Sequence, residues 1–291
     1  MLNKIKEYLV PGAAIYDVGN YLFCPIENAS EGLVANAYYF SHPAWAEEYL
    51  TYCHRSEEFK SRWEAAIGNW DNKVVLDIGC GPGNLLATLG GKPKVIIGVD
   101  VAEGSLKLAK ELGYVPLLAD ATNLPFVSGF ADIVTLNATL HHCDDMEAIL
   151  KEAARLVKPN GGILVTDHDP QKSAWNFKGV GKLMWNGRLI LYRMMQKGFH
   201  KGGGQQEWGL KCEIHHRAGD GVTRDLFHNV LQKDTFDVAI YPHNHTVGKE
   251  VLQGVKGKAE FKYRLGNLLS GRNPSSDASA LSLMCVARRK N

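Results

Sequence analysis

The segment VVLDIGCGPGNLLATLG, residues 74–90, constrains the fold more than any other part of the chain. An apolar run is followed by a glycine-rich turn, and the turn is followed by residues typical of a helix. Such strand–turn–helix units build parallel sheets that bind ligands at the carboxyl ends of their strands. The segment therefore predicts an α/β fold with a nucleotide-like ligand at the turn.

The spacing of the glycines and one acid narrow the choice of ligand. Gly79, Gly81 and Gly83 form G-x-G-x-G, whereas the dinucleotide fingerprint is G-x-G-x-x-G. Asp77 precedes the first glycine by two residues and would repel a pyrophosphate held at the helix N-terminus. The same carboxylate suits a ligand with an ammonium and a sulfonium centre, such as S-adenosylmethionine (SAM). The alternative is a structural turn without a ligand.

The residues D-I-G-C-G-P-G resemble the first motif of class I SAM-dependent methyltransferases. The resemblance covers residues 72–168 and is weak at the N-terminus and in 171–278. It implies SAM as the cofactor and a last strand that runs antiparallel to the others. The pair H-H that ends N-A-T-L-H-H, 137–142, is frequent in a subgroup that includes quinone-biosynthesis and other small-molecule methyltransferases.

Strand and helix patterns alternate through the rest of the chain, which predicts a doubly wound, mostly parallel, Rossmann-like sheet of seven strands. An inserted helical and loop cap is expected after the fifth strand. The expected strands are 73–78, 94–100, 114–120, 131–137, 162–169, 235–244 and 280–289, and the expected helices lie in 43–67 (two), 84–90, 103–113, 145–162 and 221–232.

This pattern predicts four segments along the chain. Residues 1–70 form an N-terminal helical cap, of which 1–40 wrap the core or cover the site. Residues 71–170 form the SAM-binding core. Residues 171–220 form an insertion that acts as a lid or packs on the core, and HKGGGQQ within it would let a lid move. Residues 221–291 complete the core, with a loop insertion at 246–278.

Acids end three successive predicted strands, at Asp77, Asp100 and Asp120. A single aspartate there is commonly a cap or loop residue, but three in register indicate a binding edge. By the resemblance, Asp100 accepts hydrogen bonds from the ribose hydroxyls, and Asp120 lies near the adenine amino group. The expected cofactor-binding residues are Asp77, Gly79, Cys80, Gly81, Gly83, Asp100, Val101, Asp120, Ala121 and Asn137.

Histidines supply the candidate general bases. His168 follows the fifth strand and so faces the ligand edge, and His141 lies in the loop after the fourth strand. Each could equally be a packing or loop residue. A metal centre built from His168, Asp169, His215, His243 and His245 is conceivable, but no close-spaced ligand motif supports it, and no metal is expected.

Composition limits the other classes of function. The six cysteines are scattered, and no apolar run reaches the length of a membrane span, so the chain is expected to be cytoplasmic. Residues 1–170 hold 13 Lys and Arg against 22 Asp and Glu, whereas 171–291 hold 20 against 9. The basic part either attracts the acidic part or faces an anionic substrate, a membrane or RNA.

The predicted function is SAM-dependent methyl transfer to a small molecule, with a hydroxyl oxygen as the first choice of acceptor. C- or N-methylation of a small molecule is an alternative. An RNA methyltransferase is less favoured, because the chain lacks a polybasic block and a base-methylation motif. A SAM-binding protein without catalysis is the remaining alternative.

Overall fold

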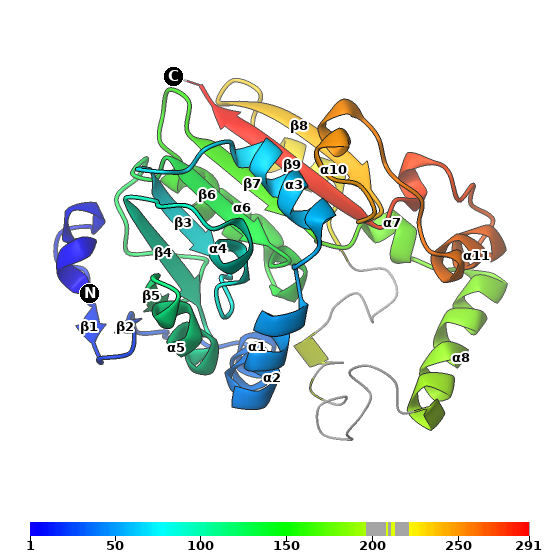
Figure 1. Cartoon of the computed structure of the whole chain (residues 1–291), viewed down its shortest axis with the longest axis horizontal. Coiled ribbons are helices and arrows are strands. Elements are labelled where there is room, and N and C mark those ends of the chain that lie inside the picture. Colours follow the sequence, from blue (N-terminus) through cyan, green and yellow to red (C-terminus); the bar gives the residue numbers. More distant parts are fainter. Residues whose placement is uncertain (196–207, 209–210, 213–220, 291) are drawn as a thin grey trace.

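A twisted sheet with helices on both faces forms the centre of the molecule (Figure 1). The computed structural model describes residues 1–195, 208, 211–212 and 221–290. Within these residues the sheet has nine strands in the order β1-β2-β5-β4-β3-β6-β7-β9-β8. The strands are β1 (Tyr16–Asp17), β2 (Leu22–Phe23), β3 (Val74–Ile78), β4 (Val95–Asp100), β5 (Val115–Leu118), β6 (Ile133–Asn137), β7 (Ile163–Asp167), β8 (Phe236–His243) and β9 (Ser282–Arg289).

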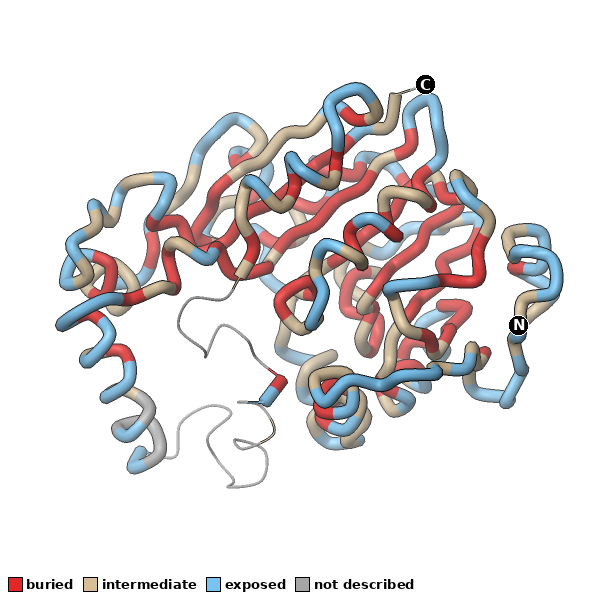
Figure 2. Tube along the Cα trace, turned by 180° about the vertical axis from the view of Figure 1, so that it is seen from behind, coloured by how far each residue is buried: buried red, intermediate tan, exposed pale blue. Residues whose placement is uncertain are grey.

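The pleat of the strands divides the core into two apolar layers. In β3, Val74, Leu76 and Ile78 pack on one side of the sheet, and Val75 packs on the other. Buried positions are accordingly concentrated along the strands, and the outer sides of the helices are exposed (Figure 2). One layer is covered by α6 (Met146–Leu156) and α10 (Arg224–Val230), and the other by α3 (Glu57–Ile67), α4 (Asn84–Leu89) and α5 (Glu103–Glu111).

Strand directions confirm the predicted mostly parallel, Rossmann-like sheet. Strands β3 to β7 are parallel, and β9 runs antiparallel between β7 and β8, as the resemblance implied. The predicted number of seven strands is wrong. The short hairpin of β1 and β2 extends the sheet beyond β5, and two-residue strands are too short to leave an alternating pattern in the sequence.

The N-terminal region forms several helices, and α1 (Glu31–Ser41) and α2 (Pro43–Tyr52) lie near the carboxyl ends of the parallel strands. Ser30 and Ser56 cap α1 and α3 by accepting hydrogen bonds from the backbone N–H groups of Leu33 and Phe59. The two helices expected in 43–67 are present, and α3 packs directly on the sheet with Trp63 fully buried. The further elements here are η1 (Leu2–Lys4) and η2 (Lys6–Tyr8).

A second group of helices follows β7 and β8. Residues 246–278, expected as a loop, contain a helix whose Tyr263 packs against Trp185 of the preceding insertion, with ring centroids 5.5 Å apart. The segment HKGGGQQ lies outside the described residues. No helix among the described residues is long and apolar enough to cross a membrane. The elements are α7 (Lys172–Trp175), α8 (Gly179–Met195), η6 (Lys249–Gln253), α11 (Phe261–Leu269) and η7 (Asp277–Ser279).

Candidate active site

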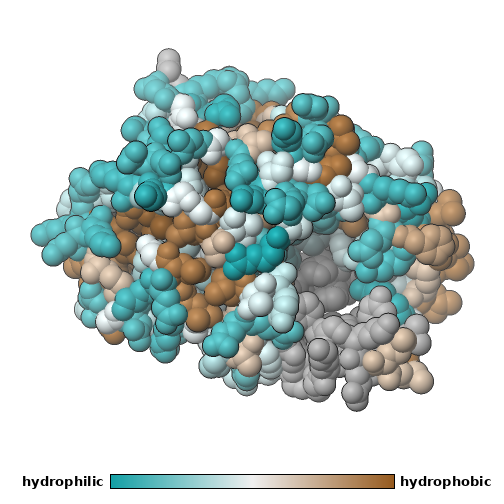
Figure 3. All heavy atoms as spheres, viewed as in Figure 1, coloured by the Kyte–Doolittle hydropathy of each residue, from teal (hydrophilic) through white to brown (hydrophobic). Residues whose placement is uncertain are grey.

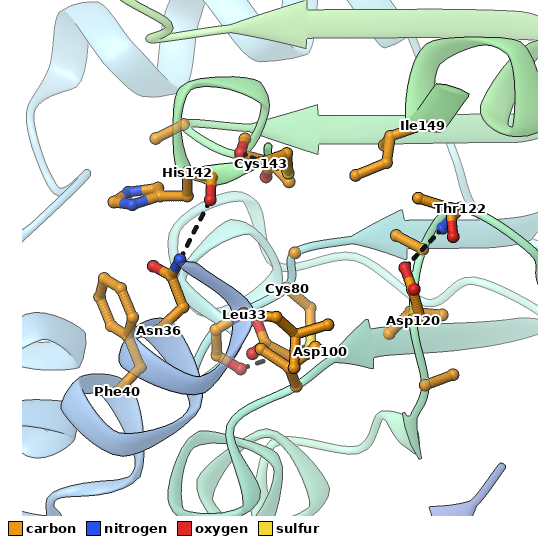
Figure 4. A pocket seen from close by; sticks show the side chains of 18 of the residues that line it. Leu33, Asn36, Phe40, Cys80, Asp100, Asp120, Thr122, His142, Cys143 and Ile149 are labelled. Carbon is orange, nitrogen blue, oxygen red and sulfur yellow. Dashed lines mark hydrogen bonds between the residues drawn. The ribbon is translucent and has the colours of Figure 1, made fainter. Parts of the chain in front are cut away.

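A cavity of about 260 Å³ opens at the carboxyl ends of β3, β4, β5 and β6. Asp120, Thr122 and Ile149 lie at one end, and Asn36, Phe40 and His142 lie at the other (Figure 4). All the predicted cofactor residues except Gly83 line it: Asp77, Gly79, Cys80, Gly81, Asp100, Val101, Asp120, Ala121 and Asn137.

The glycine turn lines the cavity, and its backbone adopts conformations that residues with a side chain disfavour. Gly79 has φ +68°, and a Cβ there would collide with the side chain of Thr139. Gly81 has φ +51°, and a Cβ there would meet no protein atom within 4 Å. This backbone is therefore open to close approach by a ligand. Gly83 is the N-cap of α4 and does not line the cavity.

Asp100 ties the end of β4 to this turn. Its Oδ2 accepts a hydrogen bond of 2.8 Å from the N–H of Gly81, and its Oδ1 accepts one of 2.9 Å from the N–H of Ala102. Burial raises the pKa of Asp100, although these backbone bonds oppose the shift. Asp120 accepts a bond of 2.9 Å from the N–H of Thr122. Both carboxylates keep further lone pairs for ligand hydroxyl or amino groups.

Asp77 is buried at the end of β3 among neutral donors. Its Oδ2 accepts from the hydroxyl of Tyr114 at 2.9 Å, and its Oδ1 accepts from the hydroxyl of Thr135 at 2.8 Å. Burial raises the pKa of Asp77 to about 7 against the effect of these bonds, and the nearby charge of Asp100 adds to the rise. The carboxylate lacks a cationic hydrogen-bond partner among the described residues, so a cationic ligand would be favoured beside it.

Two asparagines add acceptors to the same wall. The amide nitrogen of Asn84 donates to the carbonyls of Tyr49, at 3.0 Å, and Cys53, at 2.9 Å, which fixes its orientation. Oδ1 of Asn84 and Oδ1 of Asn137 are buried without a hydrogen-bond partner in the structure. A ligand ammonium would supply the donors that these oxygens lack. The residues present therefore fit the SAM expected from the sequence.

Helices α1 and α2 supply the second wall, within the predicted N-terminal cap, but none of its residues was singled out from the sequence. The amide nitrogen of Asn36 donates to the carbonyl of His142 at 3.0 Å, joining α1 to η3 (Leu140–His142) (Figure 4). The ring of Phe40 meets those of Tyr49 and His142 edge-on, at 5.6 and 5.4 Å between centroids. The two contacts with His142 join residues more than 100 positions apart, so no local sequence pattern predicts them.

Neither predicted base lines the cavity. His141 is buried, and its Nδ1 lies 2.8 Å from Oδ1 of Asp169, while its ring centroid is 4.0 Å from that of His142. The side chain of His168 is 21% exposed, and its ring packs edge-on against His54 with centroids 4.7 Å apart. His141 thus lies one residue behind the wall, next to the lining residue His142. His168 lies two residues behind it, because His54 separates it from the lining residue Tyr49.

A buried ionic cluster lies behind His168. Asp167 accepts from Nε of Arg62 at 2.9 Å and from Nε2 of His243 at 2.7 Å, and all three side chains are fully buried. Nδ1 of His243 accepts from the N–H of His245, so its proton is on Nε2. Burial alone would raise the pKa of Asp167, but the charge of Arg62 and the bonds from the imidazoles hold it well below its usual value.

The candidate ligands of the conceivable metal centre include His168, Asp169, His243 and His245 of this region. The described residues contain no group of three His, Cys, Asp or Glu side chains placed to hold a metal ion. His215, one of the candidates, lies outside the part of the chain that the structure describes.

The chain is similar in sequence to known methyltransferases over its central part. Residues 76–165 match the family model of a methyltransferase domain. A tRNA (carboxymethyluridine(34)-5-O)-methyltransferase of Arabidopsis thaliana is 37% identical over 97 residues, which are 32% of this chain and 23% of that protein. A ubiquinone biosynthesis O-methyltransferase of Leptothrix cholodnii is 27% identical over 152 residues, 48% of this chain and 64% of that protein. The chain therefore spans less than two thirds of either relative.

Among solved structures, geranyl diphosphate C-methyltransferase from Streptomyces coelicolor, in complex with S-adenosyl-L-homocysteine, has a similar fold. The TM-score is 0.54 at 12% identity, over 90% of this chain and 98% of that one.

The fold and the cavity define a class: Rossmann-like α/β proteins with a cofactor site at the carboxyl edge of the sheet. Within that class the chain contains a class I SAM-dependent methyltransferase domain, and SAM is the cofactor of this domain.

Proposed function

We propose that the protein transfers a methyl group from SAM to a hydroxyl oxygen of a small molecule. One observation carries the proposal: a single cavity has the cofactor residues on one wall and Asn36, Phe40 and Tyr49 on the other. A reactant between the two walls would be held against the methyl group and shielded from water. Methyl transfer depends mainly on such alignment and shielding.

In the proposed reaction the acceptor oxygen attacks the methyl carbon in line with the bond to sulfur. That bond breaks, its electron pair goes to sulfur, and S-adenosylhomocysteine leaves. The hydroxyl proton must pass to a base. Phe40 and His142 line the cavity at the end away from Asp120 (Figure 4), where the acceptor would lie, and the ring of the lining residue Tyr49 meets that of Phe40.

We propose Tyr49 as the group nearest the proton. Its hydroxyl lies 2.8 Å from Nε2 of His54. Burial first, and then the neighbouring His168, lowers the pKa of His54 well below its usual value. This imidazole is therefore neutral at pH 7, the form that can take a proton, but the same burial makes it a weak base. In this proposal His168 acts through His54, and His141 acts through His142, each as a positioning residue.

The other acceptors remain alternatives to be tested. C- or N-methylation would use the same cavity without the same need for a base. An RNA acceptor is favoured by one observation, the 37% identity to the Arabidopsis tRNA methyltransferase. A protein that binds SAM without catalysis would use only the first wall.

The experiment has two stages. Calorimetric titration with SAM tests binding, and Gly81→Val is the variant expected not to bind. Small metabolites and purified tRNA are then offered separately with SAM carrying a labelled methyl group, and S-adenosylhomocysteine and the labelled product are measured. A labelled methyl ether from the metabolite fraction supports the proposal. Labelled tRNA, an N- or C-methyl product, or SAM binding without any product overturns it.

A further inference from the structure

Helix α8 carries a row of exposed apolar side chains that the proposed reaction does not use. Val180, Leu183, Ile190 and Met194 are 61%, 75%, 65% and 79% exposed. Their spacings of three, seven and four residues place them on one side of the helix. We call these four residues the α8 stripe. A row of four large exposed apolar side chains on one helix is unusual, and such patches commonly mark a binding surface.

The opposite side of α8 explains why the stripe stays outside. Trp185 is buried, and its ring lies against Phe177 at 4.6 Å and Tyr263 at 5.5 Å between centroids. This packing fixes α8 on α11 and turns the stripe away from that contact. Two residues of α11, Phe261 and Leu268, are themselves 74% and 59% exposed. Hydrophobic side chains accordingly gather over α11 and the adjoining part of α8 (Figure 3).

Basic residues outnumber acids in the segments that contain and adjoin the stripe, and one of these bases, Lys256, pairs with Asp277. Lys178 and Lys182 are exposed beside it, and the guanidinium of Arg188 lies over the ring of Trp185, 3.4 Å from its centroid. The surrounding segments, 172–195 and 256–272, contain one acid, Glu260, against these bases: Lys172, Lys178, Lys182, Arg188, Arg193, Lys256, Lys258, Lys262, Arg264 and Arg272. Much of the positive charge of the back part of the chain is therefore in these two segments.

We propose that the α8 stripe docks the protein on an anionic lipid surface. Helices that lie in a bilayer interface combine an apolar side with lysines and arginines, which are attracted by anionic headgroups. A second copy of the chain is a poorer occupant, because pairing two stripes would bring like charges together. RNA would meet the positive charge but would leave the four aliphatic side chains in water. This surface goes beyond the proposed methyl transfer and does not depend on it.

The test is co-sedimentation of the full chain with vesicles of equal parts phosphatidylcholine and phosphatidylglycerol, and with vesicles of phosphatidylcholine alone. The wild type is expected to bind the mixed vesicles and to bind less in high salt. The double variant Leu183→Glu/Ile190→Glu should lower the partition coefficient by about tenfold or more. Val18→Glu is the matched control, since Val18 is 51% exposed at the far edge of the sheet.

SAM affinity and the thermal transition of each variant show whether it is folded. Wild-type binding that is lost in the double variant and kept in Val18→Glu supports the proposal. It is overturned if the wild type ignores both vesicles, or if the double variant binds as tightly as the wild type. A double variant that only converts a dimer to a monomer overturns it too, because the stripe is then a contact between copies.

Discussion

Two buried aspartates at one edge of the sheet have opposite surroundings. Asp77, at the end of β3, receives hydrogen bonds from the neutral hydroxyls of Tyr114 and Thr135, and its pKa is raised to about 7. Asp167, at the end of β7, is paired with the Arg62 guanidinium, and its pKa is well below the usual value. The strands lie two positions apart in the sheet.

The difference separates a binding acid from a structural one. The charge of Asp167 is balanced within the protein by Arg62, so the surroundings of Asp167 need no ligand. Asp77 receives hydrogen bonds from neutral donors only, so a cationic ligand would stabilise its ionised form. Burial alone does not distinguish the two, since both side chains are almost fully buried.

The largest effect is expected from Asp167→Asn. The change leaves the charge of Arg62 buried without a partner, and we expect unfolding to become easier by about 3–5 kcal/mol. In the wild type this contribution is present above the usual aspartate pKa of 3.8 and is lost as the pH falls through the lower folded value. Urea unfolding at neutral pH measures it. An equal loss of stability in Asp77→Asn would contradict the distinction between a binding aspartate and a structural one.

Gly81→Val should abolish SAM binding, with at least about a hundredfold loss of affinity, because φ is +51° and the new side chain would enter the cavity. Gly254→Val is the matched control, since Gly254 also has positive φ and open space but lies after η6. Calorimetry on both variants checks the expectation. An equal loss of affinity in both variants would show that backbone strain is responsible. Wild-type affinity in Gly81→Val would contradict the proposed site.

Asp77→Asn should weaken SAM binding by about 1–3 kcal/mol, the scale of a lost charged acceptor. Stability should fall by less than about 1 kcal/mol, because the amide replaces a buried carboxylate that has no ionic partner. Titration calorimetry and urea unfolding on the same sample give both numbers. Unchanged affinity would mean that the acid serves only to hold Tyr114 and Thr135.

The smallest effect concerns pH. Below about 7 Asp77 is protonated, so SAM affinity should rise with pH and level off as the carboxylate ionises. Tyr114→Phe removes a bond that favours the ionised form and should move the midpoint upward by less than about one pH unit. Asp77→Asn, measured in parallel, accounts for the titration of the ligand itself. A midpoint that moves downward would contradict the assignment.

The residues expected to bind the cofactor lie together around the cavity, and the signals that picked them out in the sequence are local. The turn at Gly79 and the acids at strand ends follow from chain order, since parallel strands bring their carboxyl ends to one edge. Tyr114, which bonds Asp77, is 37 residues away and carried no signal. His141 and His168 follow strands whose carboxyl ends lie at this edge of the sheet, but neither lines the cavity. They lie behind its wall, where their neighbours include Asp169 and His54 respectively.

The regions that were missed depend on contacts between distant segments. Asn36 meets His142 across 106 residues, and only the folded sheet brings α1 to that loop. Residues 246–278 looked like a loop because the apolar residues of α11 divide between α8 and solvent, with Phe261 and Leu268 exposed. Tertiary packing, not local periodicity, stabilises helices α1 and α11.

The position of β9 has a consequence for synthesis. Strand β9, residues 282–289, lies inside the sheet between β7 and β8, and β8 pairs with no other strand among the described residues. While the chain emerges from a ribosome, one edge of β7 and one edge of β8 therefore stay unpaired until residues 282–289 are made. Nascent chains stalled before residue 282 would offer two unpaired strands to chaperones or to one another.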